Sequence, residues 1–288
     1  MSAERIYRVG FVGFGMIGKV HAYGYATLPY YYDPMPLRAR VTHVCTTRAE
    51  TAAKSAAITG ADHAVTDFRQ VTENPEVDIV HICTPNDQHL PALLSAMAHG
   101  KHIYCDKPLV CNLAEAAQVR AALAGYQGTS QMTLQNRFFP AIMRAQQLLA
   151  EGFLGQLLEV RANYLHSGSA DPRAPLKWKL SAAAGGGVIA DLAVHILDLV
   201  HALVGDYRDL LASTHVAYTQ RPSVADPTAM VPVDAEDSVM ILAHPRQGGL
   251  ANITASKITT GSEDEVTISL HGSQGALRFN AMTPHWLE

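Results

Sequence analysis

The stretch YRVGFVGFGMIG, residues 7–18, decides the fold of the first half of the chain. Its apolar start predicts a buried parallel strand, and a helical pattern begins near Met16. The Gly-x-Gly-x-x-Gly turn between them lets the chain pivot and lets backbone N–H groups approach a pyrophosphate at the helix N-terminus. The strand–turn–helix context therefore predicts a dinucleotide site, and a tight turn without a ligand is the alternative.

Strand and helix patterns alternate after this turn. A helix over 88–99 ends at Gly100, a plausible residue just past a helix end. Such alternation predicts a doubly wound parallel sheet with right-handed crossovers, which binds ligands beyond the carboxyl ends of its strands. The proline-containing segment 28–40 is predicted to be a loop. The later strands of this half are expected at 41–45, 63–65, 77–83, 101–105 and 129–135.

The end of the second strand bears on the choice of cofactor. A carboxylate there usually binds the ribose 2′-hydroxyl of NAD. Here the chain reads Thr46-Thr47-Arg48, with no acid before Glu50. Hydroxyls and a guanidinium suit a 2′-phosphate, so the sequence favours NADP over NAD. The alternative is that Arg48 only caps the next helix.

Two further segments fall at carboxyl ends of strands. They are Thr84-Pro85-Asn86 with His89, and Asp106-Lys107-Pro108. An ammonium at this edge of the sheet can stabilise an alkoxide, which favours a functional Lys107 over a merely solvated one. The predicted cofactor contacts are Gly13, Gly15, Met16, Ile17, Thr46, Thr47, Arg48, Thr84, Pro85, Asn86, His89, Asp106 and Lys107.

The pattern changes in the second half to long strand-like runs. We predict an α+β domain with an open, mostly antiparallel sheet over residues 136–288, after a dinucleotide-binding domain over 1–135. The segment 220–232 is predicted to be a proline-rich loop. The expected strands cover 156–166, 210–218, 238–243, 249–257, 266–271 and 276–279.

One helix of this half carries polar groups on an apolar segment. After Gly185-Gly186-Gly187, a helix over 187–203 holds Asp191, His195 and Asp198 at spacings of four and three, which places them on one face. Such groups are costly to bury without partners or a function. We expect His195 to act as the acid/base and Asp191 to position a substrate hydroxyl and tune the imidazole, so that both contact substrate. Asp191 could instead cap the helix start, and Asp198 could be structural.

Bulk properties narrow the function further. The 288 residues carry a net charge of −4 without a long basic run, which argues against a nucleic-acid partner. An uncharged apolar stretch long enough for a membrane span is absent from the sequence. The four cysteines form no C-x-x-C pair. Cys45, Cys83 and Cys105 lie at or near the ends of predicted strands and are predicted to be small buried side chains rather than metal ligands or disulfides, as fits the cytoplasm.

Several segments together resemble the Gfo/Idh/MocA family, named for glucose–fructose oxidoreductase and inositol dehydrogenase. Besides the glycine turn, they are CTPNDQH (83–89), GKHIYCDKPL (100–109), NRFFPA (136–141), GFLGQLLEVR (152–161), GGGVIADLAVHILDL (185–199) and GSQGALRF (272–279). The resemblance implies a Rossmann domain plus an open-faced sheet domain, and NAD(P)-dependent chemistry on a sugar, cyclitol or related polyol. It also implies a homodimer or homotetramer formed through the C-terminal sheet.

The resemblance also implies roles for single residues. Lys107 matches the family's E-K-P lysine, and Asp191 and His195 match its D-x-x-x-H pair. Arg137 and Trp178 are implied as substrate contacts. The sequence departs from the family where Asp106 replaces Glu and Ala193 replaces Gly, and family members usually continue beyond residue 288.

The resulting hypothesis is acid/base catalysis of hydride transfer, with the substrate alcohol between the nicotinamide and the helix at 187–203. His195 exchanges the hydroxyl proton, since the ordinary histidine pKa of about 6.5 suits both directions. Lys107 stabilises negative charge on oxygen. The alternatives are an NAD-dependent glycoside hydrolase of the same fold and a non-catalytic NADP-sensing regulator. A metalloenzyme using Asp191, His195 and His201 is disfavoured, because His201 is turned away from the His195 face.

Overall fold

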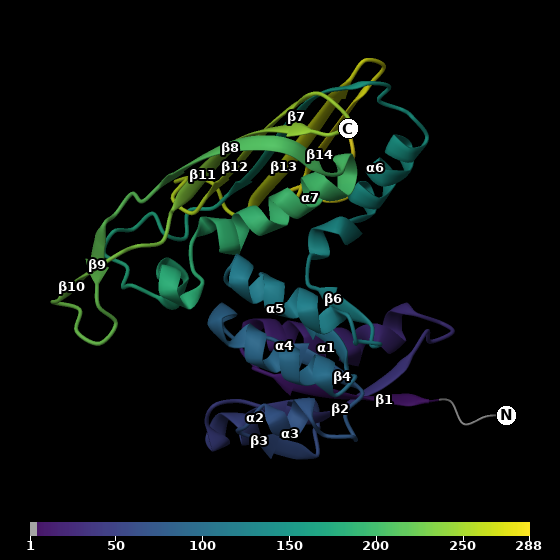
Figure 1. Cartoon of the computed structure of the whole chain (residues 1–288), viewed down its shortest axis with the longest axis vertical. Coiled ribbons are helices and arrows are strands. Elements are labelled where there is room, and N and C mark those ends of the chain that lie inside the picture. The colour runs from purple at the N-terminus through teal and green to yellow at the C-terminus, as the bar shows by residue number, and fades with distance from the viewer. Residues whose placement is uncertain (1–4) are drawn as a thin grey trace. The chain divides into compact units, whose positions relative to one another are not determined.

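The computed structural model describes residues 5–288. The chain forms two compact units, Met1–Thr133 and Leu134–Glu288, and each unit is described by itself. Figure 1 shows a sheet with helices packed on it in each of them.

The N-terminal unit is a parallel six-stranded sheet in the order β3-β2-β1-β4-β5-β6, which confirms the predicted doubly wound fold. The strand predicted before the glycine turn lies inside this sheet as β1, and its Val9 and Phe11 are buried in the core. The strands are β1 (Ile6–Val12), β2 (Arg38–Cys45), β3 (His63–Val65), β4 (Ile79–Ile82), β5 (His102–Cys105) and β6 (Ser130–Met132). The helices are α1 (Met16–Tyr31), α2 (Ala49–Thr59), α3 (Arg69–Thr72), α4 (His89–Ala98) and α5 (Leu113–Leu123).

The prediction of a loop over 28–40 was wrong at both ends. Helix α1 continues through Pro29 to Tyr31, and β2 begins at Arg38. A proline removes one helical N–H donor, but the last turn tolerates this loss because Tyr32 N–H still donates to the Leu28 carbonyl at 3.1 Å.

The C-terminal unit is a mixed, mostly antiparallel sheet in the order β14-β13-β7-β12-β11-β8, as predicted; only β7 and β12 pair in parallel. The expected loop over 220–232 instead contains a small hairpin, β9 (Gln220–Pro222) with β10 (Met230–Pro232). The other strands are β7 (Leu157–Leu165), β8 (Tyr207–His215), β11 (Ser238–Pro245), β12 (Leu250–Ser256), β13 (Glu265–Gly272) and β14 (Ala276–Asn280). The helices are α6 (Pro140–Ala150) and α7 (Val194–Val204).

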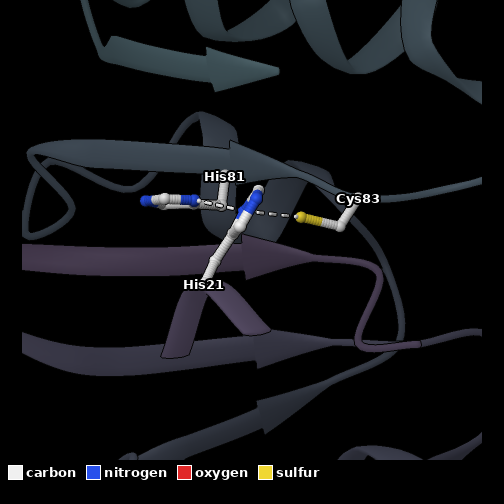
Figure 2. Close-up of side chains that lie close together, drawn as sticks. All are labelled: His21, His81 and Cys83. Carbon is white, nitrogen blue, oxygen red and sulfur yellow. Dashed lines mark hydrogen bonds between the residues drawn. The ribbon is translucent and has the colours of Figure 1, made fainter. Parts of the chain in front are cut away.

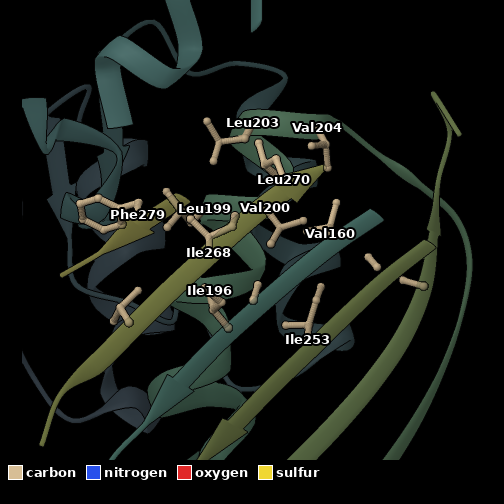
Figure 3. Packing of buried hydrophobic residues seen from close by; sticks show 14 of the residues in the cluster. Val160, Ile196, Leu199, Val200, Leu203, Val204, Ile253, Ile268, Leu270 and Phe279 are labelled. Carbon is tan, nitrogen blue, oxygen red and sulfur yellow. The ribbon is translucent and has the colours of Figure 1, made fainter. Parts of the chain in front are cut away.

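Helix α7 is the core helix of this unit. Its buried side chains, Ile196, Leu199 and Val200 among them, pack on sheet residues such as Val160 and Ile268 (Figure 3). The helical stretch Ala182–Val204 is long and apolar enough to cross a membrane by length and composition, with a mean hydropathy of 1.8. Because 56% of its most apolar window is buried inside the protein, its apolar character is explained by the core.

Candidate active site

The glycine turn of the N-terminal unit has the geometry of a dinucleotide loop. Gly13 has φ +84°, and a Cβ there would lie 2.6 Å from the Cys83 carbonyl oxygen. A Cβ on Gly18 would lie 2.9 Å from the Gly13 carbonyl oxygen. At Gly15, by contrast, a Cβ would meet no atom within 4 Å. Two of these glycines are therefore required by close packing, whereas the third leaves space for a pyrophosphate at the start of α1.

The segment after β2 presents polar groups without a carboxylate. Arg48 is exposed and is the N-cap residue of α2, but its side chain makes no capping hydrogen bond. The Thr46 hydroxyl lies 2.6 Å from that of Thr51 and donates to the Arg48 carbonyl at 3.0 Å. Thr47 is exposed. The guanidinium of Arg48 is thus not used to cap α2, which leaves it able to meet a phosphate.

The segments after β4 and β5 are tied together by His89. This ring is fully buried, and its two nitrogens lie 2.9 Å from the Pro108 carbonyl oxygen and 3.0 Å from that of Thr84. His89, predicted as a cofactor contact, lies between these two carbonyl groups and contacts both segments. Asn86 is also buried, in a short 3-10 helix over Asn86–Gln88.

Lys107 is held at the carboxyl end of β5 through its neighbour Asp106. The Asp106 carboxylate accepts hydrogen bonds from the Lys107 amide at 2.8 Å and from the Thr133 hydroxyl at 2.8 Å. Asp106 therefore fixes the backbone from which the half-buried Lys107 side chain extends.

In the C-terminal unit, Asp191 and His195 lie where the helical geometry changes. A π-helical turn, Ile189–Ala193, contains Asp191 and runs directly into α7, which begins one residue before His195. The His195 side chain is buried, and its ring centroid lies 5.9 Å from that of Tyr164. A π turn inside a helix is a common feature of functional sites.

Two lysines that the sequence did not single out hold Asp191. Lys179 Nζ lies 2.9 Å from Asp191 Oδ1, and the buried Lys257 Nζ lies 3.5 Å from Oδ2. Burial lowers the pKa of Lys257, whereas the neighbouring Asp191 carboxylate raises it. Lys257 directly follows β12, so its position at the end of a predicted strand was the available signal.

The start of this helix is capped by a glutamate from a distant part of the chain. The Ile189 amide donates to Glu236 Oε1 at 2.9 Å, and Gly187, with φ +108°, leaves room for that carboxylate. A Cβ on Gly187 would lie 2.3 Å from Glu236 Oε1. Glu236, rather than Asp191, therefore caps the start of this helix.

Asp198 has a structural partner. Its carboxylate accepts two hydrogen bonds from the guanidinium of Arg137, one of them at 2.7 Å, in a bidentate ion pair. These hydrogen bonds raise the pKa of Arg137. Arg137, predicted to contact substrate, is therefore engaged by Asp198, whereas Trp178 is exposed beside Lys179.

These features define a class of protein. One unit has a glycine turn shaped for a dinucleotide and a lysine at a strand end, and the other has a histidine one turn after a carboxylate held by two lysines. Together they are typical of nucleotide-dependent oxidoreductases.

Comparison with known proteins gives the family. A model described as an oxidoreductase family with an NAD-binding Rossmann fold matches residues 7–133, and one for the GFO/IDH/MocA C-terminal domain matches residues 142–278. Levoglucosan dehydrogenase of Pseudarthrobacter phenanthrenivorans is 30% identical, over 94% of this chain and 73% of that protein. Inositol 2-dehydrogenase of Rhizobium meliloti is 27% identical, over 98% of this chain and 78% of that protein.

Solved structures agree. Levoglucosan dehydrogenase in complex with NADH and levoglucosan has a TM-score of 0.94 at 30% identity, and the match covers 98% of this chain and 75% of that one. An NAD binding oxidoreductase from Klebsiella pneumoniae has a TM-score of 0.93 at 29% identity, with the same coverage. The chain belongs to the GFO/IDH/MocA family of NAD-binding oxidoreductases, which confirms the resemblance seen in its motifs.

Proposed function

We propose that this chain transfers a hydride between a bound nicotinamide dinucleotide and a hydroxyl-bearing carbon of a sugar, cyclitol or related polyol. The names of the similar dehydrogenases support this substrate class, since levoglucosan and inositol are polyhydroxylated rings. The observation that carries the proposal is the ionic cluster of Asp191, Lys179 and Lys257 one turn before the buried His195.

The nicotinamide, when bound, accepts or supplies the hydride. His195 takes up the hydroxyl proton during oxidation and returns it during reduction. Asp191, held as a carboxylate by two ammonium groups, accepts a hydrogen bond from a substrate hydroxyl. Lys107 stabilises the negative charge that develops on the substrate oxygen.

The test is a screen of sugars, cyclitols and dihydrodiols, with NAD and NADP in parallel, that follows the absorbance of the reduced cofactor. With the best substrate, His195→Gln is expected to lower kcat by about 10²-fold or more while the Kd for cofactor stays unchanged. His201→Gln is the matched control, because His201 is exposed on the same helix. Wild-type turnover in His195→Gln would remove this residue from the mechanism.

The same screen separates the alternatives. Release of free sugar without net formation of reduced cofactor would identify a glycoside hydrolase. Tight cofactor binding without turnover of any compound would favour a regulator. Either outcome would contradict the proposed dehydrogenase.

We also propose that NADP is preferred over NAD. The exposed Arg48, with Thr46 and Thr47 before it, supports this preference. The levoglucosan dehydrogenase complexes contain NADH, so the two cofactors must be compared directly. Arg48→Ala is expected to raise KM for NADP by about tenfold, the loss of one charge-assisted contact, and to leave KM for NAD unchanged. An equal effect on both cofactors would contradict the preference.

We further propose that the protein is a homodimer or homotetramer and that it is located in the cytoplasm. The outer face of the C-terminal sheet exposes Leu211 and Leu242, which pair across β8 and β11, together with Met240. A contiguous exposed apolar surface of this kind is typical of a protein interface. The four free cysteines are consistent with a reducing compartment.

A further inference from the structure

Two histidines and a cysteine converge inside the N-terminal unit. His21 Nδ1 lies 3.2 Å from His81 Nδ1 and 3.4 Å from Cys83 Sγ. The three potential ligand atoms all lie within 4.8 Å of one another. Figure 2 shows the His21 ring between the His81 ring and the Cys83 thiol, with a contact to each; His21 is contributed by α1, and His81 and Cys83 by β4 and the residue that follows it.

The contacts within this group depend on which imidazole nitrogen carries a proton. Two facing Nδ1 atoms can share only one proton. If His81 donates it, then His21 Nδ1 must accept from both His81 and the Cys83 thiol. A cation bound between His21 Nδ1, His81 Nδ1 and Cys83 Sγ would instead accept a lone pair from each of these three atoms.

We propose that His21, His81 and Cys83 form a binding site for a thiophilic divalent transition metal, with Zn²⁺ as the reference ion. Imidazole nitrogen and thiolate sulfur are the ligands that Zn²⁺ prefers, and a site with three protein ligands takes water as the fourth. Coordination displaces the thiol proton of Cys83 to solvent, and the sulfur binds as thiolate.

The two distances from His21 are close to those of tetrahedral coordination, and the remaining pair of ligand atoms lies within 4.8 Å. Zn–N bonds of about 2.0–2.1 Å and Zn–S bonds of about 2.3 Å place tetrahedral ligand atoms roughly 3.3–3.6 Å apart. The distances from His21 Nδ1 to its two neighbours, 3.2 Å and 3.4 Å, lie close to this range. Only small side-chain movements are therefore needed to bring the ligands onto one ion.

The surroundings orient the ligands. The His81 ring stacks on Phe11 with the centroids 4.7 Å apart, and its Nε2 lies 2.9 Å from the Tyr25 hydroxyl. With Nδ1 bound to a metal, Nε2 carries the proton and donates to Tyr25, the kind of outer contact that fixes a metal-binding tautomer. The Asp106 carboxylate adds negative charge near His21.

The site joins α1, which follows the dinucleotide loop, to the end of β4, which packs against that loop. His21 lies on the helix that follows the glycine turn, and the Cys83 carbonyl oxygen packs against Gly13. A bound ion would therefore link α1 to β4 and stabilise the N-terminal unit directly behind the cofactor loop. His21 and His81 lie 60 positions apart, so no ligand spacing in the sequence predicts this group, and Cys83 appeared there as a small buried side chain.

Titration of the metal-free full chain with Co²⁺ tests the proposal, because cobalt replaces zinc and thiolate ligation gives a sulfur-to-cobalt charge-transfer band. We expect one equivalent to produce that band together with the visible absorption of tetrahedral cobalt, and Zn²⁺ to abolish both. Zn²⁺ at a 100-fold excess over its Kd should raise Tm by about 5 °C or more.

Variants assign the ligands. Cys83→Ser should remove the charge-transfer band, and His21→Asn, on a half-buried helix position, should weaken cobalt binding about 100-fold or more. Cys111→Ser is the control, since this half-buried cysteine lies outside the group and should leave the titration unchanged. A wild-type chain without the band, or a band that persists in folded Cys83→Ser or His21→Asn, would overturn the site.

Discussion

At the residue scale, the glycine turn separates packing from ligand binding. Gly13 and Gly18 are crowded by backbone atoms, whereas Gly15 faces open space. A side chain at the first two positions must disturb the fold. At Gly15 it can only interfere with a ligand that approaches the turn.

Substitution of Gly15 should therefore weaken cofactor binding without unfolding the protein. Its φ of −75° suits alanine, and the added methyl group meets no protein atom. For Gly15→Ala we expect a Tm within about 2 °C of wild type and a Kd for the dinucleotide raised by roughly tenfold or more. Isothermal titration and thermal unfolding measure the two quantities.

Two neighbouring glycines serve as controls for this prediction. Gly24→Ala, inside α1 with open space around it, should stabilise the protein by up to about 1 kcal/mol and leave the Kd unchanged. Gly13→Ala should lower Tm strongly, since its Cβ would overlap the Cys83 carbonyl. A normal Kd in Gly15→Ala would contradict the proposed pyrophosphate position.

Lys257 is predicted to position Asp191 rather than to stabilise the fold. Lys257→Met removes a buried charge, and Asp191 keeps its ion pair with Lys179. We expect kcat to fall about tenfold or more because Asp191 is less firmly placed, while the free energy of unfolding changes by less than about 1 kcal/mol. Steady-state kinetics and urea unfolding test this, with the exposed Lys54→Met as control; unchanged kcat would be incompatible with the role.

At the element scale, the helix that carries Asp191 and His195 combines two helical geometries. The spacing of four and three residues predicted that Asp191, His195 and Asp198 share one face, but it assumed a uniform α-helix. The π turn over Ile189–Ala193 depends on contacts made far away in the sequence, such as the bond from the Ile189 amide to Glu236. The periodicity of a short segment does not reveal contacts with distant residues. The sequence therefore did not predict the π turn or its capping residue, Glu236.

Asp78, the residue before β4, holds the start of β1. Its carboxylate accepts hydrogen bonds from the Arg8 amide at 2.8 Å and from Arg8 Nε at 3.1 Å. Burial raises the pKa of Asp78, but the hydrogen bonds and charge of Arg8 lower it by more. The net pKa is therefore below its usual value. The stabilisation is thus fully present above the unfolded pKa of about 3.9 and is lost as the pH falls through the folded pKa.

This gives a pH-dependent prediction for the N-terminal unit. Asp78→Asn should lower the free energy of unfolding by about 1–2 kcal/mol at pH 7, and the difference from wild type should be smaller at pH 3. Urea unfolding at the two pH values measures it. Glu76→Gln, an exposed neighbour 3.9 Å from the same arginine, should have little effect at either pH. A difference that is independent of pH would show that ionisation of Asp78 is not responsible.

At the scale of the whole molecule, self-association can be tested on the outer face of the C-terminal sheet. Leu242→Lys places a charge beside Leu211 on that face, near the edge formed by β8. We expect this variant to sediment as a monomer with an unchanged far-UV spectrum, whereas wild type sediments as a dimer or tetramer. Ile58→Lys, on an exposed position of α2, is the control. If the Leu242→Lys variant keeps the wild-type mass, the interface does not lie on this face.

The sequence predicted both folds and most of the polar residues of the candidate site. Strand patterns and the glycine turn are local signals, and they identified the parallel sheet and the open, mostly antiparallel one. The partners of those polar residues were not predictable. Arg137 with Asp198, and Lys257 with Asp191, come from distant segments that only the folded chain brings together. Proline rules also failed at Pro29, where the position in the last helical turn decides the outcome.

The strand order of the C-terminal unit has a consequence for synthesis on the ribosome. Strand β7 is the first strand of this unit to be made, yet both of its neighbours, β12 and β13, are made much later, and Glu159 waits for Leu250. The N-terminal sheet can close once Thr133 has left the exit tunnel. The nascent chain therefore carries an unpaired central strand while residues 166–249 are made, and we expect this half to limit the rate of folding and to need chaperones.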